Sequence, residues 1–206
     1  IRGGKACGHN WFMQGRGPKK TNSFEDFAAA ARTLIALGWT KPGNITIHGG
    51  SAGGLLVGAT VNLAPELFRA AVAEVPFVDV LTTMLDDTLP LTPPEWPEWG
   101  NPIESATDYA TIKAYAPYEN IHATDYPHIL ATSGLTDPRV TYWEPAKWIA
   151  RLRARRTDAG LSLLRTEMAA GHGGKAGRFN QLHEVAFVYA FVIFVHTVLR
   201  EKGEWQ

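Results

Sequence analysis

Short β-branched segments alternate with segments of helical periodicity along this sequence, and that order constrains the fold more than any other feature. Apolar residues recur with helical spacing from Phe24 to Leu37; Ser23 is the expected N-cap, Asp26 its capping partner, and Gly38 follows the last turn. A strand–helix–strand order favours parallel strands joined by crossover helices, so the predicted class is α/β. The expected strands span 45–48, 68–75, 129–133 and 161–167, and the expected later helices span 55–63, 144–156 and 181–199.

Two stretches lack this regularity, and one late segment is unusually apolar. Residues 1–22 are rich in Gly and Lys and are predicted to form a loop. Nine prolines occur from Pro65 to Pro127 inclusive, so residues 76–128 are expected to form an irregular excursion with one or two short helices. The eleven-residue apolar run 185–195 is shorter than a bilayer span, which predicts a buried C-terminal helix and no membrane partner.

Size, charge and cysteine content exclude several classes of function. With 206 residues and 45% hydrophobic character, the chain can bury one sizeable core, and we expect a single domain over residues 1–206. The 20 basic and 20 acidic residues balance, whereas a nucleic-acid-binding domain is usually basic, so no nucleic-acid partner is expected. Cys7 is the only cysteine, which excludes an intramolecular disulfide and a Cys-based zinc site and agrees with a cytoplasmic location. No metal site or cofactor is expected.

The strongest local motif is Gly49-Gly50-Ser51-Ala52-Gly53, a G-x-S-x-G sequence between a predicted strand and a predicted helix. Glycines on both sides of a serine permit the sharp turn that exposes a nucleophile. The N–H of Ala52, at the start of the helix, is then placed to stabilise a developing oxyanion. A phosphate-binding turn or a purely structural turn is the alternative that this pentapeptide leaves open.

A serine nucleophile needs a base, and the base needs an acid that orients it. In an α/β domain these groups are expected in the order Ser, Asp, His, each just beyond a strand. Asp137 and His172 both follow predicted strands, and His172 lies between glycines. Asp79 occurs too early, and Asp125 precedes its strand, so neither is the expected acid. We therefore predict a catalytic triad of Ser51, Asp137 and His172.

Six segments, in order through nearly the whole chain, form a recognisable set. They are Arg2-Gly3-Gly4, Gly49-Gly50-Ser51-Ala52-Gly53-Gly54, Val75-Pro76-Phe77-Val78-Asp79-Val80, Glu98-Trp99-Gly100-Asn101-Pro102, Tyr142-Trp143-Glu144-Pro145-Ala146-Lys147-Trp148 and Gly171-His172-Gly173-Gly174-Lys175. These segments resemble the catalytic domain of the prolyl oligopeptidase family of serine peptidases, and within that family the oligopeptidase B group.

The resemblance implies an α/β-hydrolase fold, with a mostly parallel sheet and helices on both faces, of which this chain is the C-terminal part. The remaining strands, a tyrosine that supplies a second oxyanion donor and a β-propeller that admits only short peptides are expected before Ile1. The resemblance assigns Ser51, Asp137 and His172 as nucleophile, acid and base. It also matches Arg139 to a position that anchors a substrate carbonyl, with a surface ion pair as the alternative.

The charge distribution bears on the substrate. No Lys or Arg lies between Arg69 and Lys113, but eight acidic residues do. An acidic segment beside a nucleophile attracts cationic substrates, although a solvated acidic loop has the same composition. The resemblance to the oligopeptidase B group implies cleavage after Arg or Lys, with Glu95 and Glu98 as substrate carboxylates and Pro97 where that group has a further acid.

Three functions remain open at this point. The first is a serine endopeptidase that hydrolyses short peptides after Arg or Lys. The second is a free-standing esterase or lipase with the same triad, which the acidic segment disfavours. The third is an inactive truncated chain that folds in part and binds a partner or aggregates. The oligomeric state is not predicted.

Overall fold

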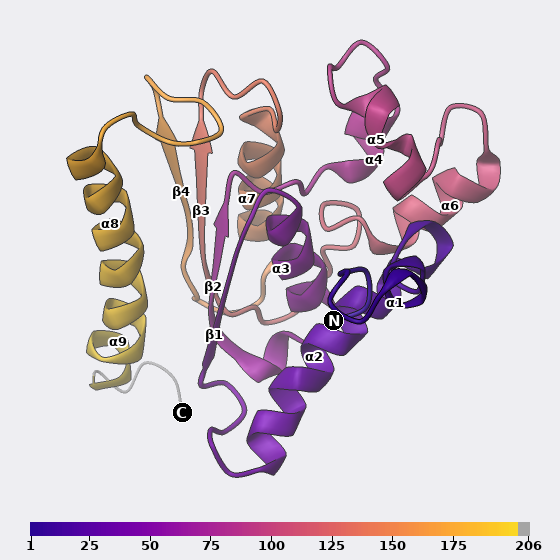
Figure 1. Ribbon diagram of the computed structural model, residues 1–206. Coiled ribbons are helices and arrows are strands. Elements are labelled where there is room, and N and C mark those ends of the chain that lie inside the picture. The colour runs from indigo at the N-terminus through magenta and orange to yellow at the C-terminus, as the bar shows by residue number, and fades with distance from the viewer. Residues whose placement is uncertain (202–206) are drawn as a thin grey trace.

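The computed structural model describes residues 1–201, which form a four-stranded parallel sheet with helices around it (Figure 1). The strands are β1 (Ile45–Gly50), β2 (Phe68–Glu74), β3 (His128–Gly134) and β4 (Ser162–Glu167), and their order in the sheet is β1-β2-β3-β4. Each strand pairs in parallel with the next, as the strand–helix order predicts. The α/β class and all four predicted strands are confirmed, with bounds that differ by at most two residues.

Helices cover both faces of the sheet (Figure 1). On one face lie α2 (Thr21–Ala36), α3 (Ala52–Leu63) and α7 (Trp143–Arg155), and on the other face lies α8 (Arg178–His196), followed by α9 (Val198–Glu201). Because side chains alternate along a strand, Ala71 and Ala73 of β2 pack toward α3 and α7, whereas Ala70 and Val72 pack toward α8. Burial on both faces explains the nearly continuous apolar sequence of β2.

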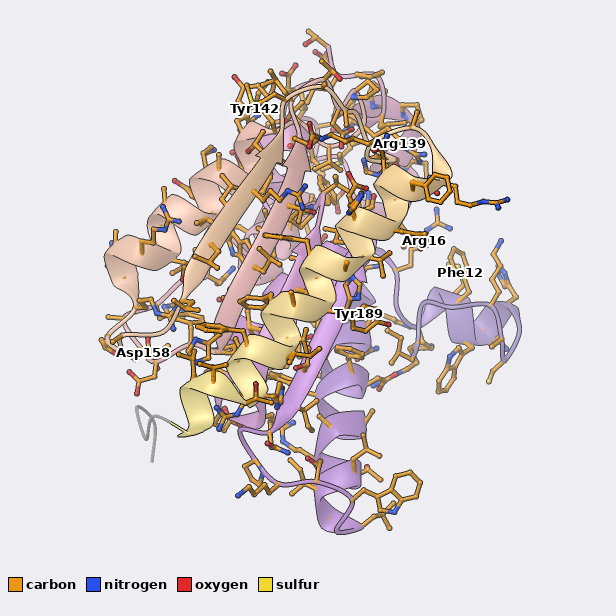
Figure 2. The ribbon with its side chains drawn as sticks, turned by 90° about the vertical axis from the view of Figure 1, so that its left-hand side faces the viewer. Phe12, Arg16, Arg139, Tyr142, Asp158 and Tyr189 are labelled. Carbon is orange, nitrogen blue, oxygen red and sulfur yellow. The ribbon has the colours of Figure 1, made fainter. Side chains whose placement is uncertain are left out.

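The expectation of a buried C-terminal helix is wrong for the outer face of α8, which is exposed. This helix packs against the sheet through Val188, Phe191 and Val195, and it lies in front of the sheet in Figure 2. On its other side Tyr189 and Ile193 are 63% and 59% exposed. Helix α8 has 19 residues and a mean hydropathy of 1.2 over an 18-residue window, so it is long and apolar enough to cross a membrane by length and composition alone. Only 17% of this window is buried within the protein. The predicted apolar run covered only part of this helix.

The N-terminal segment is more ordered than the predicted loop. It contains a short helix, α1 (His9–Met13), and a 3₁₀ turn, η1 (Gly17–Lys19). Helix α2 begins at Thr21, so Ser23 is not its N-cap; the buried Ser23 hydroxyl donates to the carbonyl of Arg2 at 2.7 Å. Asp26 is not a capping residue either, because its carboxylate accepts from the Arg2 guanidinium. The glycine after α2 is confirmed, since Gly38 has φ 76°.

The proline-rich excursion contains three α-helices rather than one or two. They are α4 (Val80–Met84), α5 (Thr92–Trp99) and α6 (Ala106–Tyr115), and a 3₁₀ turn, η2 (Pro65–Leu67), precedes β2. A second apolar core holds these helices against α2 and α3, and it includes Phe24, Leu55, Phe77, Met84 and Trp99. The excursion therefore forms a packed layer at the side of α2 and α3 that faces away from the sheet (Figure 1).

Candidate active site

The predicted nucleophile turn joins β1 to α3. Ser51 has φ 56° and ψ −121°, a conformation that a residue other than glycine rarely adopts, and such strain costs about 1–3 kcal/mol. Its N–H donates to the carbonyl of Glu74 at 2.8 Å, and its own carbonyl accepts from the N–H of Gly54 at 2.8 Å. The turn leaves no room for a side chain at Gly49, where a Cβ would lie 2.3 Å from the carbonyl oxygen of Gly53. Gly49 is therefore required by a close backbone contact, whereas a Cβ on Gly50 or Gly53 would meet no atom closer than 3.5 Å.

The predicted oxyanion donor lies at the first position of α3. The first N–H groups of a helix have no acceptor within the helix, and the N–H of Ala52 has no hydrogen-bond acceptor in the described part of the chain. The positive end of the helix dipole is directed to the same point. This N–H can therefore donate to a negatively charged oxygen beside Ser51.

The structure brings the predicted acid and base together. The His172 Nδ1 and the Asp137 Oδ2 are 2.7 Å apart, and the Asp137 carboxylate is fully shielded from solvent. The other carboxylate oxygen accepts from the N–H groups of Arg139 and Val140 at 2.8 and 3.1 Å. Backbone donors thus fix the carboxylate, which in turn orients the imidazole.

A glycine after β3 allows the two loops to meet. A Cβ on Gly134 would lie 2.5 Å from the carbonyl oxygen of Ala170 and 2.6 Å from that of Gly171. Beside it, the N–H of Thr136 donates to the carbonyl of Ala170 at 3.2 Å. The loop that carries His172 therefore packs directly on the loop that carries Asp137.

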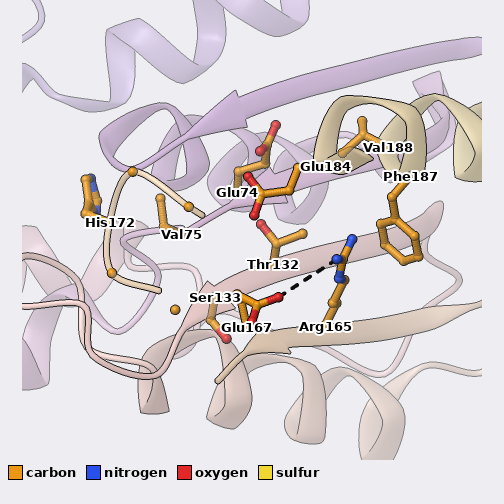
Figure 3. A pocket seen from close by; sticks show the side chains of 14 residues that line it. Glu74, Val75, Thr132, Ser133, Arg165, Glu167, His172, Glu184, Phe187 and Val188 are labelled. Atoms are coloured by element: carbon orange, nitrogen blue, oxygen red, sulfur yellow. Dashed lines mark ion pairs between the residues drawn. The ribbon is translucent and has the colours of Figure 1, made fainter. Parts of the chain in front are cut away.

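Ser51 and His172 lie beyond the carboxyl ends of their strands but open onto different cavities. Ser51 lines a cavity of about 380 Å³, whereas His172 lines one of about 160 Å³ together with Glu74, Glu167 and Glu184 (Figure 3). In the described chain no hydrogen bond joins the Ser51 hydroxyl to the His172 ring. Their contact in a catalytic triad stays a prediction.

The larger cavity gathers the other predicted site residues. Ser51, Ala52, Glu95, Glu98 and Arg139 all line it. Its wall combines the nucleophile turn, helix α5 and the loop after Asp137, which are far apart in the sequence. The structure thus places both predicted carboxylates and the predicted arginine around the same space as the serine.

Sequence reasoning missed several residues of this cavity. Phe12 and Arg16 of the N-terminal segment line it, because this segment packs against α5 rather than forming a free loop. Phe77 and Trp99 also line it, with ring centres 5.4 Å apart. Both aromatic residues lie in segments that resemble the family, and that resemblance could have identified them as candidate site residues.

A buried carboxylate, that of Glu144, binds the segment that follows β2 beside the Ser51 cavity. Glu144, in the first turn of α7, is fully buried and accepts from the N–H groups of Val78 and Asp79 at 3.0 and 2.9 Å and from the hydroxyl of Thr83 at 2.8 Å. Burial raises the pKa of Glu144 to about 8, and the nearby charge of Asp79 acts in the same direction, while these hydrogen bonds oppose the rise. Asp79 is itself buried and pairs with Lys147. These contacts hold the segment after β2, which contributes Phe77 to the cavity that contains Ser51.

No group of three or more His, Cys, Asp or Glu side chains within residues 1–201 is arranged to hold a metal ion. Cys7 is exposed and is not in a disulfide.

A strained serine between a parallel strand and a helix, with an Asp–His pair beyond later strands, defines an α/β-hydrolase domain. The model of the "Prolyl oligopeptidase family" matches residues 1–196, and the chain belongs to this family. It is 53% identical over 193 residues to "Protease 2" of Moraxella lacunata, covering 94% of this chain and 28% of that protein. It is 48% identical to "Dipeptidyl aminopeptidase BI" of Pseudoxanthomonas mexicana, covering 94% of this chain and 27% of that protein.

Solved structures agree with this assignment. Oligopeptidase B from Leishmania major superposes with a TM-score of 0.93 at 45% identity, covering 95% of this chain and 27% of that chain. Oligopeptidase B from Trypanosoma brucei with covalently bound antipain superposes with a TM-score of 0.91 at 46% identity, covering 94% of this chain and 27% of that chain. The chain thus spans little more than a quarter of the length of these relatives.

Proposed function

We propose that this chain is the catalytic unit of a serine endopeptidase that hydrolyses short peptides after Arg or Lys. The observation that carries the proposal is the hydrogen bond between the buried Asp137 carboxylate and His172, on the same edge of the sheet as the strained Ser51. Family membership supports the peptidase activity.

In the proposed mechanism, the Ser51 hydroxyl attacks the scissile carbonyl and the His172 Nε2 takes its proton. Asp137 holds the Nδ1–H tautomer of the ring and stabilises the imidazolium that forms. The N–H of Ala52 donates to the oxyanion of the tetrahedral intermediate. His172 then gives the proton to the leaving amine, and water attacks the acyl-enzyme by the same route in reverse. The hydrogen bond between Ser51 and His172 then forms in the complex with substrate, since catalytic hydrogen bonds are often long before that point.

The lining of the larger cavity supports the basic preference. Glu95 and Glu98 bring negative charge to the space beside Ser51, and a substrate guanidinium can form paired hydrogen bonds with a carboxylate. The exposed Arg139 side chain has no ion-pair partner in the described chain, so it is available to donate to a substrate carbonyl. We assign substrate contacts to Glu95 and Arg139.

The remainder of the polypeptide completes the proposed enzyme. The relatives are three to four times as long as this chain. We propose that the preceding part supplies further strands beside β1, a second oxyanion donor and a β-propeller that limits substrates to short peptides. With Cys7 as the only cysteine, we propose a cytoplasmic location.

A dipeptidyl aminopeptidase is the second candidate, because a relative with 48% identity carries that name. The carboxylates of the cavity can bind a free N-terminal ammonium as well as a basic side chain. Peptides with a blocked N-terminus separate the two activities, because only an endopeptidase cleaves them.

The test uses the complete natural polypeptide and a fluorophosphonate probe, which labels activated serine hydroxyls. We expect labelling of the wild type, none of Ser51→Ala, and normal labelling of the control Ser133→Ala, whose serine lies at the end of β3. We also expect cleavage of N-terminally blocked peptides after Arg. Labelling of Ser51→Ala at the wild-type rate would refute the assignment of the nucleophile, and cleavage of esters alone would refute the peptidase.

A further inference from the structure

The two carboxylates of the Ser51 cavity have different partners. The Glu98 Oε1 is 3.0 Å from the ammonium of Lys20, whose side chain is only 13% exposed, and its Oε2 is 3.8 Å from the Arg16 Nε. Arg16 is further held by a hydrogen bond to the carbonyl of Pro97 at 2.5 Å. An ammonium as enclosed as that of Lys20 requires a carboxylate partner. The charge of Glu98 is therefore balanced within the protein.

Glu95 has no such partner. Its Oε2 accepts from the indole N–H of Trp99 at 2.8 Å, and within residues 1–201 it forms no ion pair. It lines the cavity that contains Ser51. Its negative charge is therefore available to a cation that enters the cavity.

Trp99 connects the two carboxylates. The Lys20 ammonium is 4.5 Å from the centre of the indole ring, and Trp99 also packs against Phe77, with ring centres 5.4 Å apart. Trp99 is only 5% exposed, and its indole N–H donates to the Glu95 carboxylate. The Lys20–Glu98 pair thus helps to fix the donor that orients the Glu95 carboxylate.

We propose that Lys20 and Glu98 are a charge-balanced positioning pair that sets substrate specificity without contacting substrate. The pair holds Trp99 and leaves Glu95 as the carboxylate that receives the basic side chain. This inference rests on the proposed function, and it narrows the expected role of Glu98.

A direct consequence distinguishes the pair from two substrate carboxylates. In Glu98→Gln, Lys20 and Arg16 lose their partner and repel a cationic substrate from the neighbouring cavity. Removing the ammonium as well, in Lys20→Met/Glu98→Gln, restores the charge balance while methionine still covers Trp99. Adding a substitution at Lys20 to Glu95→Gln cannot restore the preference for Arg, because the Glu95 carboxylate contacts the substrate itself.

The experiment measures kcat/KM of the complete natural polypeptide on blocked peptides with Arg or norleucine before the scissile bond. We expect Glu95→Gln to reduce the Arg advantage by at least ~30-fold. We expect Glu98→Gln to reduce it by about 3- to 10-fold through KM, with most of the loss removed at about 0.5 M NaCl. The double variant should return to within about 3-fold of the wild type. Lys19→Met, which removes an exposed lysine next to Lys20, is the matched control and should have no effect.

Two results would refute the proposed positioning role of Lys20 and Glu98. One is a double variant no better than Glu98→Gln, and the other is a Glu98→Gln defect that salt does not reduce; both would mean that Glu98 binds the substrate. The salt series needs only the single variant, so the test survives if the double variant folds poorly. A wild type with no Arg advantage would instead refute the proposed specificity, which separates failure of the function from failure of this inference.

Discussion

Glu144 offers the most direct link between a buried group and a measurable property. In Glu144→Gln the side-chain oxygen can still accept from the N–H groups of Val78 and Asp79, and the new amide can donate to the hydroxyl of Thr83. Hydrogen bonds to all three partners are therefore retained, with the direction of the Thr83 bond reversed. What the substitution removes is a carboxyl group that titrates at an unusual pH.

The magnitude follows from the shift of its pKa from 4.5 to about 8, which burial causes. Between these values the folded protein retains a proton that the unfolded chain has lost. The contribution of this group is therefore fully present below pH 4.5 and is lost as the pH rises through 8. The free energy of unfolding falls by about 1.4 kcal/mol per pH unit in this window, or about 5 kcal/mol in all. A glutamine at position 144 has no such dependence.

The assay is urea unfolding of the wild type and of Glu144→Gln between pH 5 and pH 9. Subtracting one curve from the other cancels the groups that titrate in both proteins. We expect the variant to gain stability relative to the wild type as the pH rises, up to about pH 8. Glu104→Gln, at an exposed position, is the control and should give a flat difference. A flat difference for Glu144→Gln as well would refute the reasoning.

Three further predictions follow from contacts described above. Asp137→Asn should lower kcat by about 10⁴-fold because His172 loses its correct tautomer, and unchanged hydrolysis of a blocked Arg peptide would remove Asp137 from the mechanism. Gly134→Ala should destabilise the protein by about 1–3 kcal/mol in urea unfolding, because a Cβ collides with the carbonyls of residues 170–171; equal midpoints would contradict this. Burial and nearby arginines lower the pKa of His128 to about 4, so its contribution to the free energy of unfolding is present above pH 6.5 and lost as the pH falls through 4. In His128→Asn the free energy of unfolding should therefore depend less on pH over this window. Parallel curves of unfolding free energy against pH for the two proteins would argue against the shift.

Elements with a strong local pattern were predictable. The four strands are short β-branched or apolar segments between turn residues, and the structure has all of them. The place of Ser51, Asp137 and His172 beyond the carboxyl ends of strands follows from the order of the elements, since parallel strands bring such loops to one edge. The hydrogen bond of the Asp–His pair agrees with that order.

Elements that depend on distant partners were not predictable in the same way. The start of α2 was misplaced because Ser23 and Asp26, which resemble a capping pair, instead bind the distant Arg2. The three helices of the excursion were underestimated because prolines obscure their pattern, and contacts in the second core stabilise them. The exposed outer face of α8 was missed because its apolar residues are the same in type on both sides.

The sequence by itself determined the α/β class and the serine turn, because strand periodicity and the glycine-rich serine motif are properties of a few neighbouring residues. Only the tertiary structure decided which charges remain available. Glu95 and Glu98 are three residues apart and have the same side chain, yet Glu98 is paired with Lys20, 78 residues away, and Glu95 is not. Glu144 likewise differs from an ordinary helix-start glutamate only because its surroundings exclude water. The strength and availability of a charge depend on what the fold packs around it, and no local pattern contains that information.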